Sequence, residues 1–356
     1  QRADAGRHVP RSAQTQLFPF ITQHGNRRLG AEAFNVAVEV FVEHEVPDDR
    51  NATAGEDFHQ FDQSALRYIF SQLKNNEGVV KAINAPATSK PWYEFKSLFV
   101  TPARTSGGVD FWNENAVQLK RARDIYGVPE EIIVAIIGVE SIYGRRTGSF
   151  RVVDALYTLA FEMPERATYF RGEFEQFLLL TRENGLDPLT VKGSFAGAIG
   201  MPQFMPTSYR RFAVDFDSDG KINLWENVPD IIGSVANYLH SFGWVAGQTI
   251  VVPARIGGTE YKDIVEKGFK PHLTLAQMLP KGVEPTETVP SELVAGLFAL
   301  EIEQGQEYWL AMNNFYVITR YNRSKNYAMA VYLLANAIVR ERESQASAQA
   351  APVVSQ

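Results

Sequence analysis

Cysteine is absent from this chain of 356 residues. Its absence excludes disulfides, thiol catalysis and thiolate metal sites, and it leaves the redox compartment undetermined. Long apolar runs are also missing, and none approaches the roughly 18 to 20 residues that span a bilayer. The six histidines are scattered without an i, i+4 pair, so we do not expect a zinc protease site.

An excess of basic residues is missing as well. The chain has 35 Lys and Arg against 41 Asp and Glu, a net charge of −6 and a pI near 5.7. A nucleic-acid partner is therefore not expected, because such proteins normally present a basic surface. A hydrophobic content of 45% and an aromatic content of 12% fit a globular protein with rings available for stacking on a ligand.

The hydrophobic patterns predict a mainly α (α+β) chain with a small β insertion. Helical patterns include a helix over 165–184 that stops at Gly185, and a closing helix over about 324–341. The segments 249–252 and 315–319 are rich in β-branched and aromatic residues, which strands prefer. The predicted parts are a disordered N-terminus (1–16), an N-terminal helical subdomain (17–107), a helical core (108–247), a small β subdomain (248–314), a return to the core with the closing helix (315–342) and a disordered tail (343–356).

Glu140 closes an apolar run over 132–139. In a helix, the isoleucines three, four and seven residues earlier share its face, so the carboxylate lies on a buried stripe. An ionised carboxylate is costly to bury, so such a group raises its pKa, finds a partner, or does both. A carboxyl that is protonated near neutral pH can act as a general acid. The alternative is a structural glutamate that pairs with Arg145 or Arg146.

The segment 193–206 is dense in glycine and alanine, which let backbone come close to backbone or to a ligand. It also carries a hydroxyl (Ser194), an amide (Gln203) and apolar or aromatic groups such as Phe195. A concave sugar site needs this mixture of stacking faces and a few hydrogen bonds. A tight helix–helix crossing with a turn is the alternative.

Residues 215–226 match the EF-hand calcium loop at every defining position. Three aspartates within five residues repel one another unless a cation neutralises them, so we expect a structural calcium ion. A solvated acidic turn is the alternative. Asp230 competes with Glu226 for the last ligand position. The candidate ligands are Asp215, Asp217, Asp219, Lys221 through its carbonyl, Glu226 and Asp230.

These three features occur together in one order, and residues 90 to 340 resemble the lytic transglycosylase B family, glycoside hydrolase family 103. The N-terminal 85 residues fit this family poorly and carry an insertion around 28–62. The resemblance implies a lysozyme-like helical core with an additional α subdomain and a small β subdomain. The motifs that carry it are Val128–Ser141, Gly193–Ala198, Gln203–Pro206, the calcium loop, Gly233–Tyr238 and Phe315–Tyr327.

The resemblance implies cleavage of the β-1,4 bond between N-acetylmuramic acid and N-acetylglucosamine in peptidoglycan, giving 1,6-anhydromuramic ends without added water. Glu140 is implied as the only catalytic acid and base. The implied substrate-binding residues are Ser194, Gln203, Asn322, Tyr169, Tyr238, Tyr321, Tyr327, Arg166 and Phe195. Two positions depart from the family: Ser141 stands where Thr is usual, and Phe95 stands where Tyr is expected, so Phe95 is given no polar contact.

A single acid agrees with the sequence, because no second carboxyl has a setting like that of Glu140. Retaining glycosidases need two carboxylates about 5 Å apart and inverting enzymes about 6.5 to 9.5 Å, but one acid suffices if the N-acetyl group of the substrate assists. A muramidase-type hydrolase and a non-catalytic, calcium-dependent glycan-binding protein stay open as alternatives.

The expected partners are peptidoglycan glycan strands and proteins of cell-wall synthesis or remodelling. Calcium is the only cofactor expected, with no organic cofactor. We expect a place in the bacterial periplasm, either soluble or attached to the outer membrane by a lipid outside the given sequence. The chain begins at Gln1, which is compatible with a processed or truncated N-terminus.

Overall fold

The computed structural model describes residues 61–84 and 90–350. The predictions for 1–16, for nearly all of the insertion and for the last six residues lie outside this part of the chain. The chain forms two compact units, Gln1–Gln72 and Leu73–Gln356.

The first unit contributes one described helix, α2 (Gln63–Ser71). The helix begins after Asp62, whose carboxylate accepts a hydrogen bond of 2.8 Å from the amide of Ser64. This is an ordinary N-cap, which satisfies one of the free amides of the first turn.

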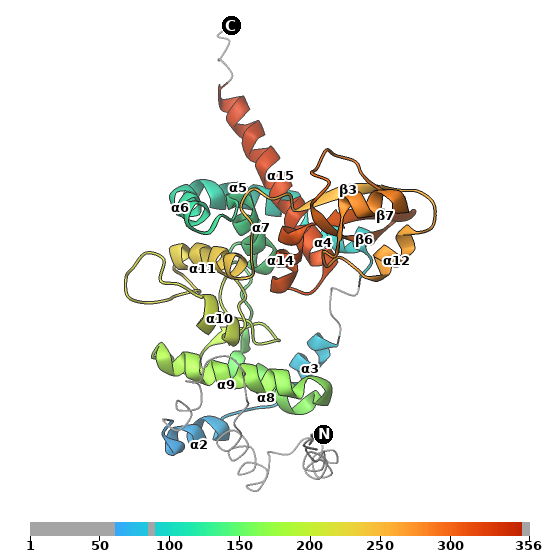
Figure 1. The fold of residues 1–356 in the computed structure, drawn as a ribbon. Helices are drawn as coiled ribbons and strands as arrows, with labels where there is room; N and C mark the ends of the chain where they lie inside the picture. Colours follow the sequence, from blue (N-terminus) through green and yellow to red (C-terminus); the bar gives the residue numbers. More distant parts are fainter. Residues whose placement is uncertain (1–60, 85–89, 351–356) are drawn as a thin grey trace, which may run out of the picture. The chain divides into compact units, whose positions relative to one another are not determined.

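The second unit is mainly helical, as the sequence predicted, and carries two sheets (Figure 1). Its helices are α3 (Glu77–Ile83), α4 (Trp92–Phe99), α5 (Pro102–Glu114), α6 (Ala116–Tyr126), α7 (Glu130–Ser141), α8 (Val152–Glu162), η3 (Pro164–Arg166), α9 (Ala167–Glu183), α10 (Pro206–Phe212), α11 (Val228–Ser241), α12 (Tyr261–Glu266), α13 (Leu275–Met278), η4 (Leu279–Lys281), α14 (Asn313–Tyr321) and α15 (Lys325–Ala350). Its strands are β1 (Phe150–Arg151), β2 (Lys192–Gly193), β3 (Val251–Ile256), β4 (Leu273–Thr274), β5 (Val283–Pro285), β6 (Val294–Ile302) and β7 (Gly305–Ala311).

Helix α7 is the central helix of the second unit and packs against α5, α6, α11 and α15 (Figure 1). All residues from 132 to 139 are buried, so apolar side chains cover every face of the helix, as expected inside a core. Pro129 precedes its first turn, and two glutamates, Glu130 and Glu131, occupy that turn. Glu140 lies at the other end, where α7 leaves the core.

Helices α8 and α9 pack against each other, and α10 packs on α9. Helix α9 ends at Glu183, and Gly185 follows with φ of +62°. Glycine adopts this left-handed conformation without a steric penalty, which is why the sequence located the end of the helix correctly. Strands β1 and β2 pair antiparallel through Phe150 and Gly193, and they tie the start of α8 to the segment that precedes Ser194.

The larger sheet is antiparallel with the strand order β4-β6-β7-β3-β5. Strands β6 and β7 form a hairpin in which Ile302 pairs with Gly305. One face buries an apolar cluster that includes Val252, Leu297 and Leu310. The expectation of a small β part is confirmed, although β3 begins at Val251 rather than at residue 249.

Two local predictions are wrong. The segment 315–319 was expected to be a strand, but it forms the middle of α14. Within it Phe315, Ile318 and Thr319 are buried at helical spacing, and Phe315 stacks on Phe298 of β6 at 4.8 Å. Tertiary packing on the sheet therefore overrides the local strand preference.

The second error concerns the tail from residue 343, which was expected to be disordered. Helix α15 instead continues to Ala350. Its last turns contain Ala, Gln and Glu, which favour helix even when they are exposed. Low sequence complexity was therefore a poor guide to order here.

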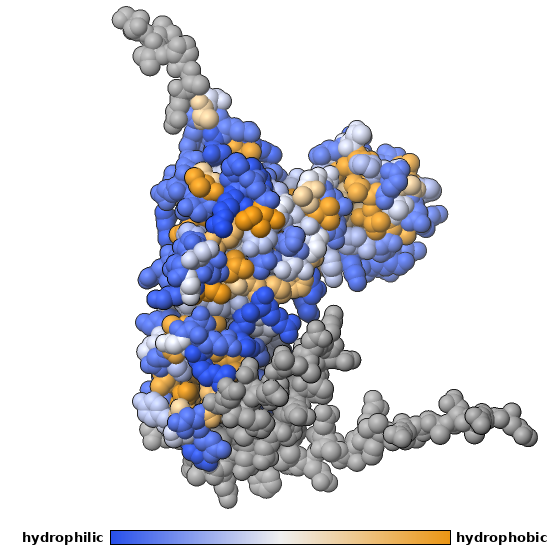
Figure 2. All heavy atoms as spheres, turned by 60° about the vertical axis from the view of Figure 1, so that its left-hand side comes forward, coloured by the Kyte–Doolittle hydropathy of each residue, from blue (hydrophilic) through white to orange (hydrophobic). Residues whose placement is uncertain are grey.

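No described helix combines the length and the apolar character that crossing a membrane requires. Figure 2 shows one face of the molecule, on which hydrophobic residues gather in separate patches among hydrophilic ones.

Candidate active site

Glu140 is the carboxyl at the C-terminal end of α7. Its Oε1 accepts a hydrogen bond of 2.6 Å from the hydroxyl of Tyr327, in the first turn of α15. No described Lys, Arg or His forms an ion pair with Glu140, so the alternative of a structural pair with Arg145 or Arg146 finds no support. The carboxyl therefore has one neutral hydrogen-bond donor and an apolar helix behind it.

This setting changes the acidity of Glu140. Burial raises its pKa from 4.5 to about 7, and the hydrogen bond from Tyr327 works in the opposite direction. Desolvation disfavours the ionised form, and no cation compensates for it. Glu140 still has partial access to solvent. It is consequently a carboxyl that can both hold and release a proton near neutral pH.

Three tyrosines form a connected group beside Glu140. The ring of Tyr327 stacks with that of Tyr321 at 6.4 Å, and Tyr321 lies 4.8 Å from Tyr238. The hydroxyl of Tyr321 donates to the carbonyl of Pro202 at 2.6 Å, and that of Tyr238 donates to the carbonyl of Arg320 at 2.6 Å. These two hydroxyls hold the backbone around the site, while the rings supply apolar walls.

The backbone just after Glu140 is strained. Ile142 and Tyr143 both have positive φ, at 53° and 54°, although neither is glycine. Left-handed conformations are costly for such residues and persist only where the surroundings enforce them. The hydroxyl of Tyr143 donates to the carbonyl of Arg104 at 2.8 Å, and Nε of Arg104 donates to the carbonyl of Gly138 at 3.1 Å.

Arg104 and Tyr143 therefore hold the end of α7 that carries Glu140, and sequence reasoning missed both. No local pattern joins Arg104 to Glu140, because the two residues lie on different helices. The sequence offered one signal for Tyr143, since it follows Glu140 closely and precedes a glycine.

Ser194 lies in the loop after β2. Its Oγ accepts hydrogen bonds from the amides of Ala196 at 3.2 Å and Ala198 at 3.0 Å. These bonds fix the hydroxyl and leave its proton as the group that can be donated. Gly148 has φ of +96°, and a Cβ there would collide with the carbonyl of Gly193. The expected close approach of backbone to backbone is thus present, between the loop after α7 and the Ser194 loop.

Gln203 lies in the same loop with φ of +53°. Its Nε2 donates to the carbonyl of Thr147 at 3.0 Å and to that of Gly200 at 2.8 Å. The amide nitrogen therefore joins the Ser194 loop to the loop after α7, and the amide oxygen is the group that can accept from a ligand.

The other predicted substrate-binding residues are more exposed. Tyr169 on α9 is 47% exposed, and the guanidinium of Arg166 lies 5.8 Å from its ring centre. Asn322, which follows α14, is also exposed, and Phe195 is half-buried beside Ser194. Burial raises the pKa of Tyr238, and electrostatic interactions with Tyr169 and Glu140 add to this effect, so Tyr169 lies near the tyrosine group.

A cavity of about 490 Å³ lies at the opposite end of α7. Glu130 lines it, but this carboxylate already accepts from Nε1 of Trp112 at 2.8 Å and pairs with Arg123 at 2.7 Å. Glu131 also lines the cavity, and burial raises its pKa as well.

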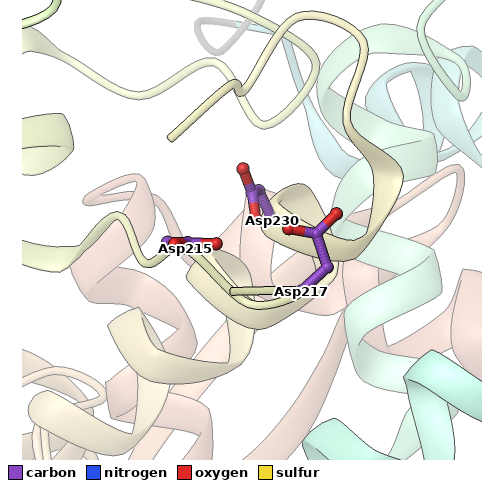
Figure 3. Close-up of side chains that lie close together, drawn as sticks. All are labelled: Asp215, Asp217 and Asp230. Atoms are coloured by element: carbon purple, nitrogen blue, oxygen red, sulfur yellow. The ribbon is translucent and has the colours of Figure 1, made fainter. Parts of the chain in front are cut away.

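The acidic loop brings three carboxylates together. Asp215, Asp217 and Asp230 can each offer one oxygen, and these oxygens lie within 4.8 Å of one another (Figure 3). Asp215 also accepts from the amides of Asp219 at 3.1 Å and Gly220 at 2.8 Å, so the loop folds around its carboxylate.

Asp230 reaches this group from the first turn of α11, and it is fully buried. Its two oxygens accept from the amides of Phe216 at 2.7 Å and Asn223 at 2.9 Å. Asp219 and Glu226 have exposed side chains on the same loop and lie outside the group of three, and Lys221, predicted to bind through its carbonyl, lies on this loop as well.

The sequence and the fold resemble known proteins over most of the chain. The transglycosylase SLT domain matches residues 49–336. The membrane-bound lytic murein transglycosylase B of Escherichia coli (strain K12) is 45% identical over 294 residues, which cover 80% of each protein.

Three solved structures have similar folds. The soluble lytic transglycosylase SltB1 of Pseudomonas aeruginosa matches with a TM-score of 0.75 and 46% identity, over 80% of this chain and 95% of its own. The Escherichia coli lytic transglycosylase Slt35 in complex with calcium matches with a TM-score of 0.73 and 44% identity, over 81% of this chain and 90% of its own. SltB3 of Pseudomonas aeruginosa in complex with NAG-anhNAM-pentapeptide matches with a TM-score of 0.70 and 30% identity, over 79% of this chain and 76% of its own.

The match to the transglycosylase SLT domain, together with the mainly helical fold with a small sheet, defines an enzyme of the transglycosylase class. Within that class, the chain belongs to the lytic transglycosylase B family. The sequence-based resemblance and the predicted activity, that of a lytic transglycosylase, are confirmed.

Proposed function

We propose that this enzyme cleaves the β-1,4 bond between N-acetylmuramic acid and N-acetylglucosamine with Glu140 as its only acid and base. The observation that carries this proposal is the isolation of Glu140, whose pKa is about 7 and whose hydrogen-bond partner is the neutral Tyr327. A lone group with such a pKa can donate a proton and then take one back.

The reaction has two steps. Protonated Glu140 gives its proton to the glycosidic oxygen while the bond from that oxygen to the anomeric carbon breaks, and the acetamido oxygen of the muramic sugar bonds to the anomeric carbon. The Glu140 carboxylate then takes the proton of the muramic 6-hydroxyl. The 6-oxygen attacks the same carbon and displaces the acetamido oxygen, which leaves a 1,6-anhydro ring and a protonated Glu140.

Ser194 and Gln203 are proposed to orient the sugars at the broken bond. The Ser194 hydroxyl has its lone pairs engaged by two amides and can donate, while the Gln203 amide oxygen can accept. Asn322, Arg166 and Phe195, with Tyr169 and the tyrosine group, are proposed as further groove residues. In the SltB3 complex a related enzyme holds NAG-anhNAM-pentapeptide, which supports a muropeptide substrate class.

The acidic loop is proposed to be an EF-hand-like calcium site. Three clustered carboxylates are hard oxygen donors, which calcium prefers, and Slt35 is described in complex with calcium. Asp215, Asp217 and Asp230 would hold the ion, and Asp230 rather than Glu226 would complete the set. Bound calcium would neutralise the negative charge of the loop and stabilise the start of α11.

The substrate class implies a place at the bacterial cell wall, and we propose the periplasm. Partners in cell-wall synthesis or remodelling stay part of this proposal.

Mass analysis of the products tests the function. Digestion of purified peptidoglycan should release fragments with 1,6-anhydromuramic ends. Fragments with reducing muramic ends would instead show a muramidase-type hydrolase, in which water attacks where the 6-hydroxyl should. Absence of any cleavage would favour a glycan-binding protein without catalysis.

A further inference from the structure

Several buried carboxyls lie outside the proposed mechanism, and Glu173 is one of them. Glu173, in the middle of α9, is 5% exposed. Its Oε2 accepts a hydrogen bond of 3.0 Å from the amide of Thr207. Burial raises the pKa of Glu173, while hydrogen bonds from Thr207 and Tyr169 oppose this effect. A buried acid is retained only where its partners offset the loss of water, so these partners indicate what it does.

The first partner, Thr207, belongs to the first turn of α10. This helix begins at Pro206, directly after the loop that carries Ser194 and Gln203. A bond from Glu173 to the Thr207 amide therefore fixes the end of that loop to α9. Backbone amides in a first helical turn have no partner within the helix, so a carboxylate is a suitable acceptor there.

The second partner, Tyr169, precedes Glu173 by one helical turn on α9, so their side chains lie on the same face. The Tyr169 hydroxyl is close enough to the Glu173 carboxyl to lower the pKa of Glu173 as a hydrogen-bond donor. Tyr169 is the most exposed of the tyrosines proposed to line the groove. Its ring also contacts Phe170 edge to face at 5.1 Å.

We infer that Glu173 is a positioning residue, which holds the Tyr169 side chain and the start of α10 at one fixed separation across the glycan groove. The inference rests on the proposed function, because it takes Tyr169 and the Ser194–Gln203 loop as two walls of the same groove. Glu173 acts through these groups and does not itself touch the sugar.

A carboxylate is suited to this task because both partners are donors. Its two oxygens can accept from the Thr207 amide and from the Tyr169 hydroxyl at the same time. Glutamine has one acceptor oxygen and would turn an amide N–H toward one of the two donors. Glu173→Gln should therefore keep the bond to Thr207 and lose the bond to Tyr169.

A double-mutant cycle with soluble, uncrosslinked glycan strands tests the inference. We expect Glu173→Gln and Tyr169→Phe each to raise KM about three- to tenfold, with little change in kcat. The KM of the double variant should not exceed the higher of the two single-variant KM values, because both changes break the same bond. Values of KM within twofold of the parent for Glu173→Gln, or effects that multiply in the double variant, would overturn the inference.

Glu175→Gln is the matched control. Glu175 lies on the same helix and burial also raises its pKa, but Arg210 is the charge that acts on it. Glu175→Gln should leave both KM and the melting temperature unchanged from those of the parent enzyme. Glu173→Asp keeps both acceptor oxygens and should restore part of the loss seen in Glu173→Gln. An equal loss in Glu175→Gln, or no restoration by aspartate, would show a general effect on folding and would contradict the inference.

Binding measurements separate this inference from the proposed reaction. The same glycan strands are titrated against Glu140→Gln with and without Glu173→Gln, and the second change should weaken binding about three- to tenfold. If the parent enzyme released fragments with reducing muramic ends, the proposed reaction would be wrong. This titration would still decide the role of Glu173. Equal affinities would remove the inference even if anhydro products form.

Discussion

Carboxyl groups meet different surroundings in two regions of the second unit. At the end of α7, Glu140 has an apolar helix behind it and a single neutral donor, and its pKa rises to about 7. In the acidic loop, Asp215, Asp217 and Asp230 crowd together and accept hydrogen bonds from backbone amides or from a side-chain amide.

The difference shows that surroundings, and not residue type, assign the role of a carboxyl group. A carboxyl without cation or amide donors keeps its proton near neutral pH and can transfer it. Carboxylates that lie close together concentrate negative charge, and a divalent cation can neutralise that charge. Glu130 is a third case, since Arg123 and Trp112 pair it in a structural role.

The largest expected effect is the loss of turnover in Glu140→Gln. General acid–base transfer typically contributes a factor of about 10² to 10⁴, so we expect a loss of at least that size. Release of soluble fragments from peptidoglycan measures it, and binding of glycan strands should persist. Glu131→Gln, on the first turn of the same helix, is the control and should stay active. Full activity of Glu140→Gln would remove Glu140 from the mechanism.

The second-largest effect is expected in the acidic loop, where calcium should raise the melting temperature of the protein. Calcium at about 100 times its Kd contributes roughly 2.7 kcal/mol, so chelation should lower the melting temperature by roughly 5 to 10 °C. Asp217→Asn should abolish this response. Glu226→Gln should preserve it if Asp230 completes the site. A melting temperature that ignores both calcium and chelator would rule out the site, and a lost response in Glu226→Gln would assign the last ligand to Glu226.

The difference in folding stability between the parent and Glu140→Gln should depend on pH, because the two proteins differ only in this carboxyl group. Because its folded pKa is raised above its ordinary value of 4.5, the folded state binds the proton more tightly than the unfolded state. Its contribution to stability is therefore lost as pH rises from about 4.5 to about 7. Relative to the parent, Glu140→Gln should gain at most about 3 kcal/mol in free energy of unfolding at pH 8, and much less at pH 4. Denaturant unfolding at the two pH values measures this, and a constant difference would contradict the raised pKa.

The smallest effect is expected from Tyr327→Phe. The hydrogen bond from Tyr327 stabilises the ionised form of Glu140, so its removal should raise the pKa of Glu140 further. The alkaline limb of kcat/KM against pH should move to higher pH in this variant. A limb that moves to lower pH would mean that Tyr327 does not donate to the carboxylate.

Local sequence patterns predicted the helix before Glu140 and an acidic loop, but not which carboxylates of the loop come together. The apolar run before Glu140 predicted a buried helix with an acid at its end, and the spacing of aspartates predicted a chelating loop. Both patterns depend on neighbours within a few turns, which the sequence displays directly. The same local reasoning failed for 315–319 and for the tail after residue 342, where packing on the sheet and helix propensity outweighed β-branching and low complexity.

The sequence by itself therefore determined the buried helix that ends near Glu140, the acidic loop and the family that the chain resembles. Only the tertiary structure decided the partners, because hydrogen bonds join residues that are distant along the chain. It gave Glu140 the hydroxyl of Tyr327 rather than a neighbouring arginine, and it fixed α7 through Arg104. It also brought Asp230 into the acidic group while Glu226 stayed outside. These choices depend on how helices pack, and no periodicity within one segment encodes them.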